Sequence, residues 1–151
     1  MTQCGYQKVV TCTTRKPRDG EKDGVDYHFL TSEEFERLIS KGAFIEFVSY
    51  NGNSYGTLKK DVEGDRKAII LEPGGVKFFL SKLTGVNRPK VIFLDVPDDV
   101  LAERMLKRGD KEEDVKKRIE NDRNAGFDEI KKEADIVIHS FPIEGDFVFP
   151  F

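Results

Sequence analysis

Two short apolar runs, residues 68–71 (AIIL) and 91–94 (VIFL), most constrain how this chain can fold. Both are continuous rather than alternating, a pattern typical of strands covered on both faces of a parallel sheet. Helical segments separate them, and a last strand is predicted at residues 135–139. Strands that alternate with helices in this way favour an α/β layered fold.

The first half of the chain predicts a smaller, antiparallel arrangement. Residues 8–12 are rich in β-branched side chains, and residues 25–29 alternate between apolar and polar positions, so both are predicted strands. Thr31 and Glu34 form a capping box at the start of a helix of about three turns. Residues 43–50 read as a strand that runs into Asn51-Gly52, a strong hairpin signal. We therefore expect a small antiparallel sheet inserted into the α/β fold.

Length and charge set limits on the partners of this chain. Its 151 residues suit a single domain, and 25 basic against 28 acidic residues give a net charge of −3. This balance argues against binding nucleic acid or an anionic membrane. The two cysteines, Cys4 and Cys12, fit neither a disulfide framework nor a metal site, and no apolar stretch is long enough to span a membrane. We expect a cytoplasmic protein without a metal centre.

The loop after the first strand, TTRKPRDGEKDG, is a candidate phosphate site. Arg15 and Arg18 flank Pro17, which restrains the backbone, and paired arginines can bind phosphate oxygens bidentately. Spacing alone favours a solvated loop in which the arginines pair with nearby acidic residues. These are Asp19, Glu21 and Asp23.

Glu46 interrupts an apolar strand, where a carboxylate is costly unless it has partners. Guanine presents two adjacent N–H donors on its Watson–Crick edge, and an ionised carboxylate can accept both. The alternative is an exposed glutamate on an edge strand. Tyr27, taken alone, would likewise be a core aromatic.

Three segments, TCTTRKPRDGEKDGVDYHF, FIEF and NGNSYGT, closely resemble the nucleotide-binding segments of guanylate kinases. The resemblance covers residues 9–137 and is most specific across 13–57. It implies a nucleoside monophosphate kinase-like parallel sheet flanked by helices, with an antiparallel subdomain that binds guanosine monophosphate (GMP). Within one domain of residues 1–151, the regions would be GMP-binding (8–60), core strands and helix (66–97), helical lid (98–126), and last strand with aromatic tail (135–151).

The resemblance also implies roles for individual residues. The residues that would hold the phosphate of GMP or dGMP are Arg15, Arg18, Tyr27 and Tyr55. The residues that would contact guanine are Thr11, Glu46 and Thr57. Glu72, in LEPGG, stands for the first of two aspartates that the family usually shows, and a Pro-Gly-Gly turn replaces the second. The lid arginines, which would neutralise the transferring phosphoryl group, are Arg104, Arg108 and Arg118. Without the resemblance, these three read as a solvated helical surface that pairs with glutamates.

The pattern departs from the family at both ends. The 151 residues contain no GxxxxGK[ST], the glycine-rich loop that cradles the phosphates of ATP and helps to hold Mg²⁺. We therefore expect the first strand and phosphate loop to be missing, so that ATP and Mg²⁺ are cofactors by resemblance only. At the other end SFPIEGDFVFPF replaces a helix. Unpaired strand edges would favour a homo-oligomer or a completing polypeptide.

Two functions follow from this pattern. The first is a guanylate kinase-type protein that binds GMP or dGMP, with the family reaction ATP + GMP → ADP + GDP and weak or no activity in the isolated chain. The second is a catalytically inactive guanylate kinase-like module that binds protein or nucleotide.

Overall fold

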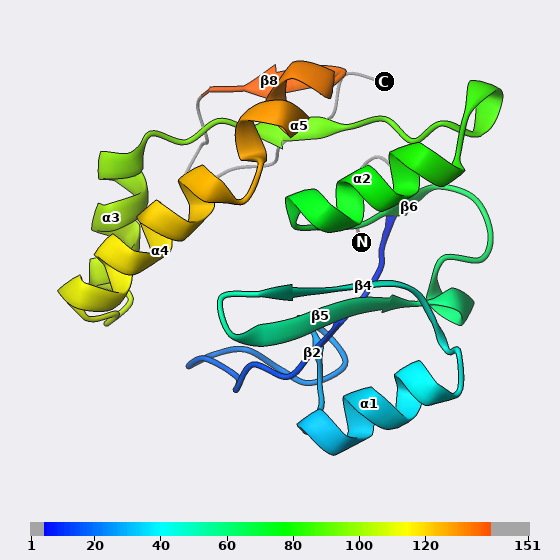
Figure 1. Ribbon diagram of the computed structural model, residues 1–151, viewed down its shortest axis with the longest axis horizontal. Coiled ribbons are helices and arrows are strands. Elements are labelled where there is room, and N and C mark those ends of the chain that lie inside the picture. The colour runs from blue at the N-terminus through cyan, green and yellow to red at the C-terminus, as the bar shows by residue number, and fades with distance from the viewer. Residues whose placement is uncertain (1–4, 140–151) are drawn as a thin grey trace. The chain divides into compact units, whose positions relative to one another are not determined.

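In the computed structural model of this chain, residues 5–139 are described, and they fall into two compact units, 5–75 and 76–139 (Figure 1). The phenylalanine-rich tail and Cys4 lie outside the described residues. No helix within residues 5–139 is long and apolar enough to cross a membrane. The division of the chain into functional regions stays a prediction.

The first unit is built on a four-stranded sheet with the strand order β3-β2-β5-β4. Its strands are β2 (Cys12–Thr13), β3 (His28–Phe29), β4 (Phe44–Tyr50) and β5 (Asn53–Leu58). The β4–β5 hairpin turns at Asn51 and Gly52, both with positive φ, as the Asn-Gly signal predicts. β2 pairs antiparallel with β5 but parallel with β3, so the prediction of an antiparallel sheet holds for two of the three pairings.

Helix α1 (Ser32–Ser40) packs on this sheet, as Figure 1 shows. The predicted capping box is confirmed, because the Thr31 hydroxyl accepts a hydrogen bond from the Glu34 backbone and the Glu34 carboxylate accepts one from the Thr31 backbone. Beneath the helix, Phe35 stacks on Phe44 with ring centroids 4.5 Å apart. The buried core is completed by Cys12 and Leu58.

Gly56 allows the rings of Phe35 and Phe44 to pack closely against β5. A Cβ atom at this position would lie 2.9 Å from Cδ1 of Phe44 and 3.1 Å from Cζ of Phe35. A larger residue would therefore push the two stacked rings apart. The short strand β5 thus needs glycine here for packing rather than for backbone conformation.

The first unit also holds one parallel pair, β1 (Gln7–Lys8) with β6 (Lys67–Ala68), and a 3₁₀ turn at Lys59–Asp61. Helix α2 (Pro73–Lys82) follows and continues into the second unit. The second unit has a 3₁₀ turn at Gly85–Asn87 and the parallel pair β7 (Ile92–Leu94) with β8 (Ile136–Ile138). Its other helices are α3 (Asp98–Lys107), α4 (Glu112–Asn124) and α5 (Phe127–Glu133).

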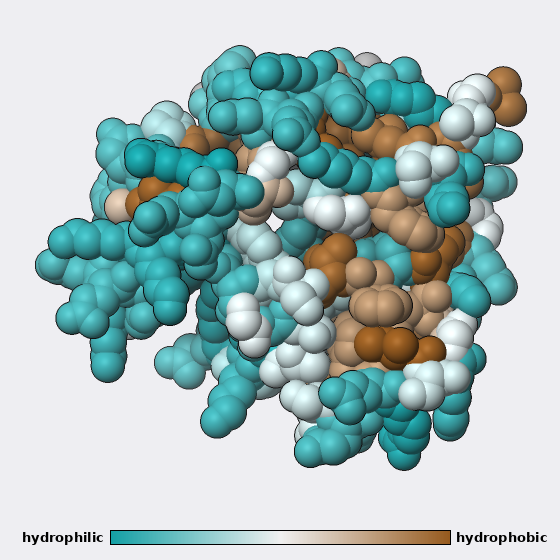
Figure 2. All heavy atoms as spheres, viewed as in Figure 1, coloured by the Kyte–Doolittle hydropathy of each residue, from teal (hydrophilic) through white to brown (hydrophobic). Residues whose placement is uncertain are grey.

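The prediction that residues 68–71 and 91–94 are buried on both faces is wrong. Ile70 is 73% exposed and Leu94 is 49% exposed. Each run contributes only part of its length to a strand, and each strand has a single pairing partner among the described residues. Figure 2 shows hydrophobic residues reaching the surface in places on an otherwise mostly hydrophilic face. The alternation of strands and helices, and with it the α/β class, is confirmed.

Candidate functional site

Glu46 is the most unusual side chain of the first unit, because it is ionisable and only 5% exposed. It lies on β4 opposite Thr57 of β5, and the Thr57 hydroxyl donates a hydrogen bond of 2.5 Å to Oε1 of Glu46. Thr57 itself is fully buried and Thr11 is 7% exposed. β4 is indeed an edge strand, but the alternative interpretation of an exposed edge glutamate is wrong.

The pairing of β4 with β5 has a register irregularity between Phe44 and Glu46. An extra residue in one strand shifts the side chains that follow it to the other face of the sheet. Phe44 and Glu46 are both buried, while Phe47 is 51% exposed. Across the irregularity, Phe44 stacks on Phe35 of α1, whereas Oε2 of Glu46 lies near Gly75 of α2.

The second oxygen of Glu46, Oε2, faces the start of α2. A Cβ atom on Gly75 would lie 3.2 Å from this oxygen, and one on Gly74 would lie 3.0 Å from Cγ1 of Val48. Sequence reasoning treated this Pro-Gly-Gly turn only as a departure from the family. In the structure its two glycines give the backbone close access to β4, so they belong to the surroundings of the carboxylate.

Burial raises the pKa of Glu46, while hydrogen bonds from the side chain and backbone of Thr57 act in the opposite direction. The net shift is upward. A ligand that donated further hydrogen bonds to the carboxylate would favour its charged form. The site is therefore suited to a neutral partner with adjacent N–H donors.

Arg15 is held by Glu21 through two hydrogen bonds, Nη1 to Oε2 at 2.9 Å and Nη2 to Oε1 at 2.8 Å. Nη1 also donates to the backbone carbonyl of Lys16 at 2.7 Å. The guanidinium carbon lies 5.5 Å from the ring centroid of Tyr27 and 5.8 Å from that of Phe29. The Arg15 side chain is only 14% exposed, so it is more buried than a solvated loop would leave it, although its pairing with Glu21 is one that this alternative allowed.

Burial alone would lower the pKa of Arg15, but the hydrogen bond and charge of Glu21, with a smaller contribution from Tyr55, raise it above its ordinary value. Tyr55 is buried and packs edge-on against Tyr27, with ring centroids 6.2 Å apart. Burial and the charge of Glu72 raise the pKa of Tyr27, which places Glu72 in the electrostatic surroundings of this group. Arg15, Tyr27 and Tyr55 therefore lie close together, and their role in binding phosphate stays a prediction.

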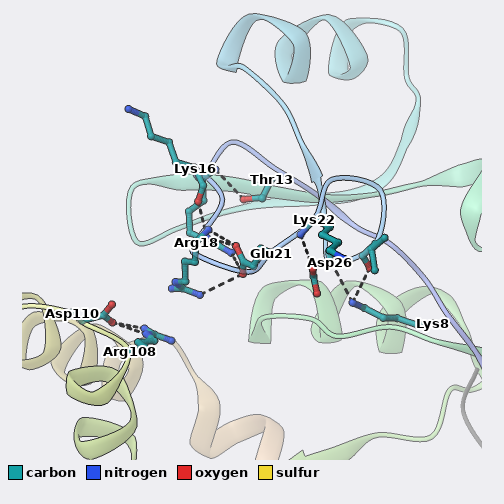
Figure 3. Close-up of polar contacts among 11 residues, drawn as sticks. Lys8, Thr13, Lys16, Arg18, Glu21, Lys22, Asp26, Arg108 and Asp110 are labelled. Carbon is teal, nitrogen blue, oxygen red and sulfur yellow. Dashed lines mark hydrogen bonds and ion pairs between the residues drawn. The ribbon is translucent and has the colours of Figure 1, made fainter.

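Arg18 is more exposed, at 42% of its side chain, and its Nη1 lies 4.0 Å from Oε1 of Glu21. Its backbone N–H donates to Oε2 of Glu21 at 2.7 Å, as drawn in Figure 3. Of the three acidic residues considered as loop partners, Glu21 is the one that pairs with Arg15. Asp23 instead accepts a hydrogen bond from the backbone of Phe29 at 2.9 Å. Spacing alone could not select Glu21 as the partner of Arg15.

The three arginines predicted for the lid lie in the second unit. Arg104 is half-buried on α3, and its backbone carbonyl accepts a hydrogen bond from the Arg108 backbone. Arg108 pairs with Asp110, and Nε of Arg118 donates to Asp122 at 2.8 Å on α4. Acidic partners thus do surround two of these arginines, although they are aspartates rather than the glutamates expected. Within residues 5–139, no group of three or more His, Cys, Asp or Glu side chains is arranged to hold a metal.

Taken together, the fold and the site define an α/β protein whose first unit, built on a small mixed sheet, holds both a buried carboxyl group and an arginine–tyrosine cluster. The family model described as guanylate kinase matches residues 3–145. This chain therefore belongs to the guanylate kinase family.

Individual relatives support the assignment. The chain is 39% identical over 124 residues to a guanylate kinase of Fusobacterium nucleatum, covering 78% of this chain and 65% of that protein. It is 40% identical over 117 residues to one from Thermotoga maritima, covering 74% and 56%. A crystal structure of guanylate kinase from Anaplasma phagocytophilum superposes with a TM-score of 0.67 at 28% identity, over 91% of this chain and 68% of that one. The chain thus spans between about half and two thirds of the length of such curated relatives.

Proposed function

We propose that this chain binds GMP or dGMP, the phosphoryl acceptor in the guanylate kinase reaction ATP + GMP → ADP + GDP. The observation that carries the proposal is the buried carboxylate of Glu46. The Thr57 hydroxyl donates a hydrogen bond to Oε1 of Glu46 and so uses one of its lone pairs. The other lone pairs of the two carboxylate oxygens can accept the two adjacent N–H donors of guanine. Thr11 and Thr57 add buried hydroxyls at the same sheet. Adenine has no such pair of donors.

For the phosphate of GMP we propose the cluster of Arg15, Tyr27 and Tyr55, together with Arg18. A guanidinium held over an aromatic ring beside a phenol hydroxyl offers several donors to a phosphate in a fixed arrangement. Glu72 acts on the same group through its charge. Its proposed contact is with the bound nucleotide rather than with a metal.

The catalytic part of the proposal is separate. Three arginines would stabilise negative charge on the transferring phosphoryl group: Arg104, Arg108 and Arg118. ATP and Mg²⁺ are the cofactors of the family reaction, and no residue of this chain is assigned to hold them. Association with a second copy or a completing polypeptide stays a prediction. The alternative is a catalytically inactive module of the same family that binds protein or nucleotide.

Calorimetric titration with GMP and AMP tests the guanine site. We expect GMP to bind more tightly than AMP, and Glu46→Gln to weaken GMP by about 1.5–3 kcal/mol, the usual size of a hydrogen bond to a charged group. That range corresponds to roughly 10- to 200-fold in affinity.

Glu36→Gln is the matched control, because Glu36 is exposed on α1 and the substitution removes the same charge. It should leave GMP affinity unchanged. Equal affinity for GMP and AMP, or an unchanged GMP affinity in Glu46→Gln, would remove the basis for a guanine site.

A further inference from the structure

We propose that Glu21 is a positioning residue for phosphate recognition, which holds the guanidinium of Arg15 in its binding arrangement before any ligand arrives. The inference rests on the proposed GMP site and adds a residue to it. The alternative is that Glu21 is an internal competitor, a carboxylate that occupies the place of the phosphate and must be displaced.

The contacts of Glu21 join a side chain to the backbone of its own loop. Its two carboxylate oxygens take one hydrogen bond each from Nη1 and Nη2 of Arg15, at 2.9 and 2.8 Å. Oε2 also accepts from the backbone N–H of Arg18 at 2.7 Å, while the Glu21 backbone N–H donates to the Arg18 carbonyl at 3.0 Å. Glu21 therefore fixes the turn between residues 15 and 21 and the orientation of Arg15 at the same time.

Arg15 keeps donors available in this arrangement. A guanidinium has five N–H donors, and the contacts with Glu21 and the Lys16 carbonyl use three of them, all on Nη1 and Nη2. The other two, on Nε and Nη2, lie along one edge of the group. Tyr55 is within hydrogen-bonding reach of the same guanidinium and can accept from one of these two donors. A phosphate oxygen can bind the other donor, or replace the Tyr55 contact, while the Glu21 contacts persist.

Displacement of Glu21 would be unfavourable for a ligand. It would break three hydrogen bonds at once and leave the backbone N–H of Arg18 without its acceptor. The hydrogen bond from Arg15 lowers the pKa of Glu21, so the carboxylate is charged at neutral pH and strongly held. By contrast, an arginine that is already ordered loses little further rotamer freedom on binding. The contacts of Glu21 therefore favour a role in positioning Arg15 over competition with the phosphate.

A double-mutant cycle tests the proposal in the full chain, with GMP and guanosine as ligands for calorimetry. The variants are Glu21→Gln, Arg15→Lys and the combination of the two. We expect Glu21→Gln to weaken GMP about tenfold, the loss of one hydrogen bond to a charged group. Guanosine, which has no phosphate, should bind unchanged. In the Arg15→Lys background the effect of Glu21→Gln should fall below about twofold, because residues that act through one another are not additive.

Asp19→Asn is the matched control, since Asp19 is an exposed acidic residue of the same loop, and it should leave both affinities unchanged. The Nε–Hε resonance of Arg15 in ¹H–¹⁵N spectra gives a second readout. It should be sharp in the ligand-free wild type and Asp19→Asn, and averaged in Glu21→Gln, with the backbone amide spectrum retained.

Tighter GMP binding by Glu21→Gln would show that Glu21 competes with phosphate and would overturn the proposal. So would an equal loss for GMP and guanosine, or a tenfold loss that persists in the Arg15→Lys background, because either would mean that Glu21 only supports the fold. In each of these cases the wild type still binds GMP. A wild-type chain that does not bind GMP would instead refute the proposed function and this inference with it.

Discussion

At the scale of single residues, the buried carboxylate of Glu46 connects proton binding to ligand binding. A charge in this position is unfavourable unless hydrogen bonds offset its lost hydration, and Thr57 supplies only part of that compensation. The raised pKa of Glu46 reflects this balance. A proton and a guanine base would therefore compete for the same oxygens.

We expect guanosine to bind more weakly as the pH falls through the raised pKa of Glu46, because the protonated acid can no longer accept both guanine N–H groups. Guanosine is the suitable ligand, since it lacks the phosphate group that itself titrates near pH 6. Calorimetry between about pH 5 and about pH 8 measures the effect, around the ordinary carboxyl range. Glu46→Gln should bind weakly at every pH. The same slope in wild type and variant would assign the titration to another group.

The raised pKa of Glu46 also determines the direction in which the free energy of unfolding changes with pH. The folded protein retains the Glu46 proton to a higher pH than the unfolded chain does. Its contribution to the free energy of unfolding therefore decreases as the pH rises from the ordinary carboxyl pKa through the raised value. Glu46→Gln removes this dependence, so the variant need not be less stable than the wild type at neutral pH.

At the scale of elements, the structural features that depend on a few neighbouring residues could be predicted from the sequence. The capping box at Thr31 and the Asn-Gly turn at Asn51 depend on hydrogen bonds and backbone angles within one short segment, and both are confirmed. Burial of residues 68–71 and 91–94 depends on what covers each strand. Periodicity carries no information about such distant partners, which is why the exposure of Ile70 and Leu94 was not predicted.

The parallel pair β7–β8 is tied together by Asp135. Its Oδ2 accepts hydrogen bonds from the Val91 backbone N–H and from Nη1 of Arg88, both at 2.8 Å. The Asp135 backbone N–H returns a hydrogen bond to the Val91 carbonyl at 2.9 Å. The hydrogen bond from Val91, followed by the one from Arg88, lowers the pKa of Asp135 to about 2.

We expect Asp135→Asn to lower the free energy of unfolding by about 1–2 kcal/mol at neutral pH, as for the loss of a charge-assisted hydrogen bond. Because the folded pKa is depressed, this stabilisation is present above the ordinary pKa of an aspartate and is lost as the pH falls toward about 2. Urea denaturation of wild type and variant, at neutral pH and at a pH approaching about 2, measures this difference in the free energy of unfolding. Asp65→Asn, at an exposed loop position, is the control. Equal stability of wild type and Asp135→Asn at neutral pH would contradict the role of this side chain.

At the scale of the whole molecule, the resemblance to guanylate kinases predicted the family and the grouping of Arg15, Tyr27 and Tyr55. It did not predict Glu21, because three acidic residues share the loop and spacing alone does not choose among them. Nor did it predict the approach of Gly75 to Glu46. That contact joins segments far apart in the sequence, and a glycine offers no side chain to suggest it.

Phosphoryl transfer is also a property of the whole molecule. We expect the 151-residue chain to phosphorylate GMP at a negligible rate, below about 0.1 per second, because these residues contain no GxxxxGK[ST] motif. A coupled assay for ADP formation with GMP present and omitted measures the rate, and calorimetry with GMP on the same sample confirms that the site is folded. Turnover within tenfold of the roughly 1–100 per second of ordinary kinases would mean that another segment holds the phosphates.

The buried cysteine of the core provides a built-in reporter for this sheet. Cys12 is 1% exposed on β2, and burial, reinforced by the charge of Asp61, raises the pKa of its thiol to about 12. At neutral pH it is therefore neither reachable nor ionised, and a thiol-reactive dye can attack it only when the sheet opens. In a Cys4→Ser background, the rate at which the dye labels Cys12 measures how often the sheet opens. Any ligand that binds only the closed sheet must slow it, whether or not the ligand has a spectroscopic signal of its own.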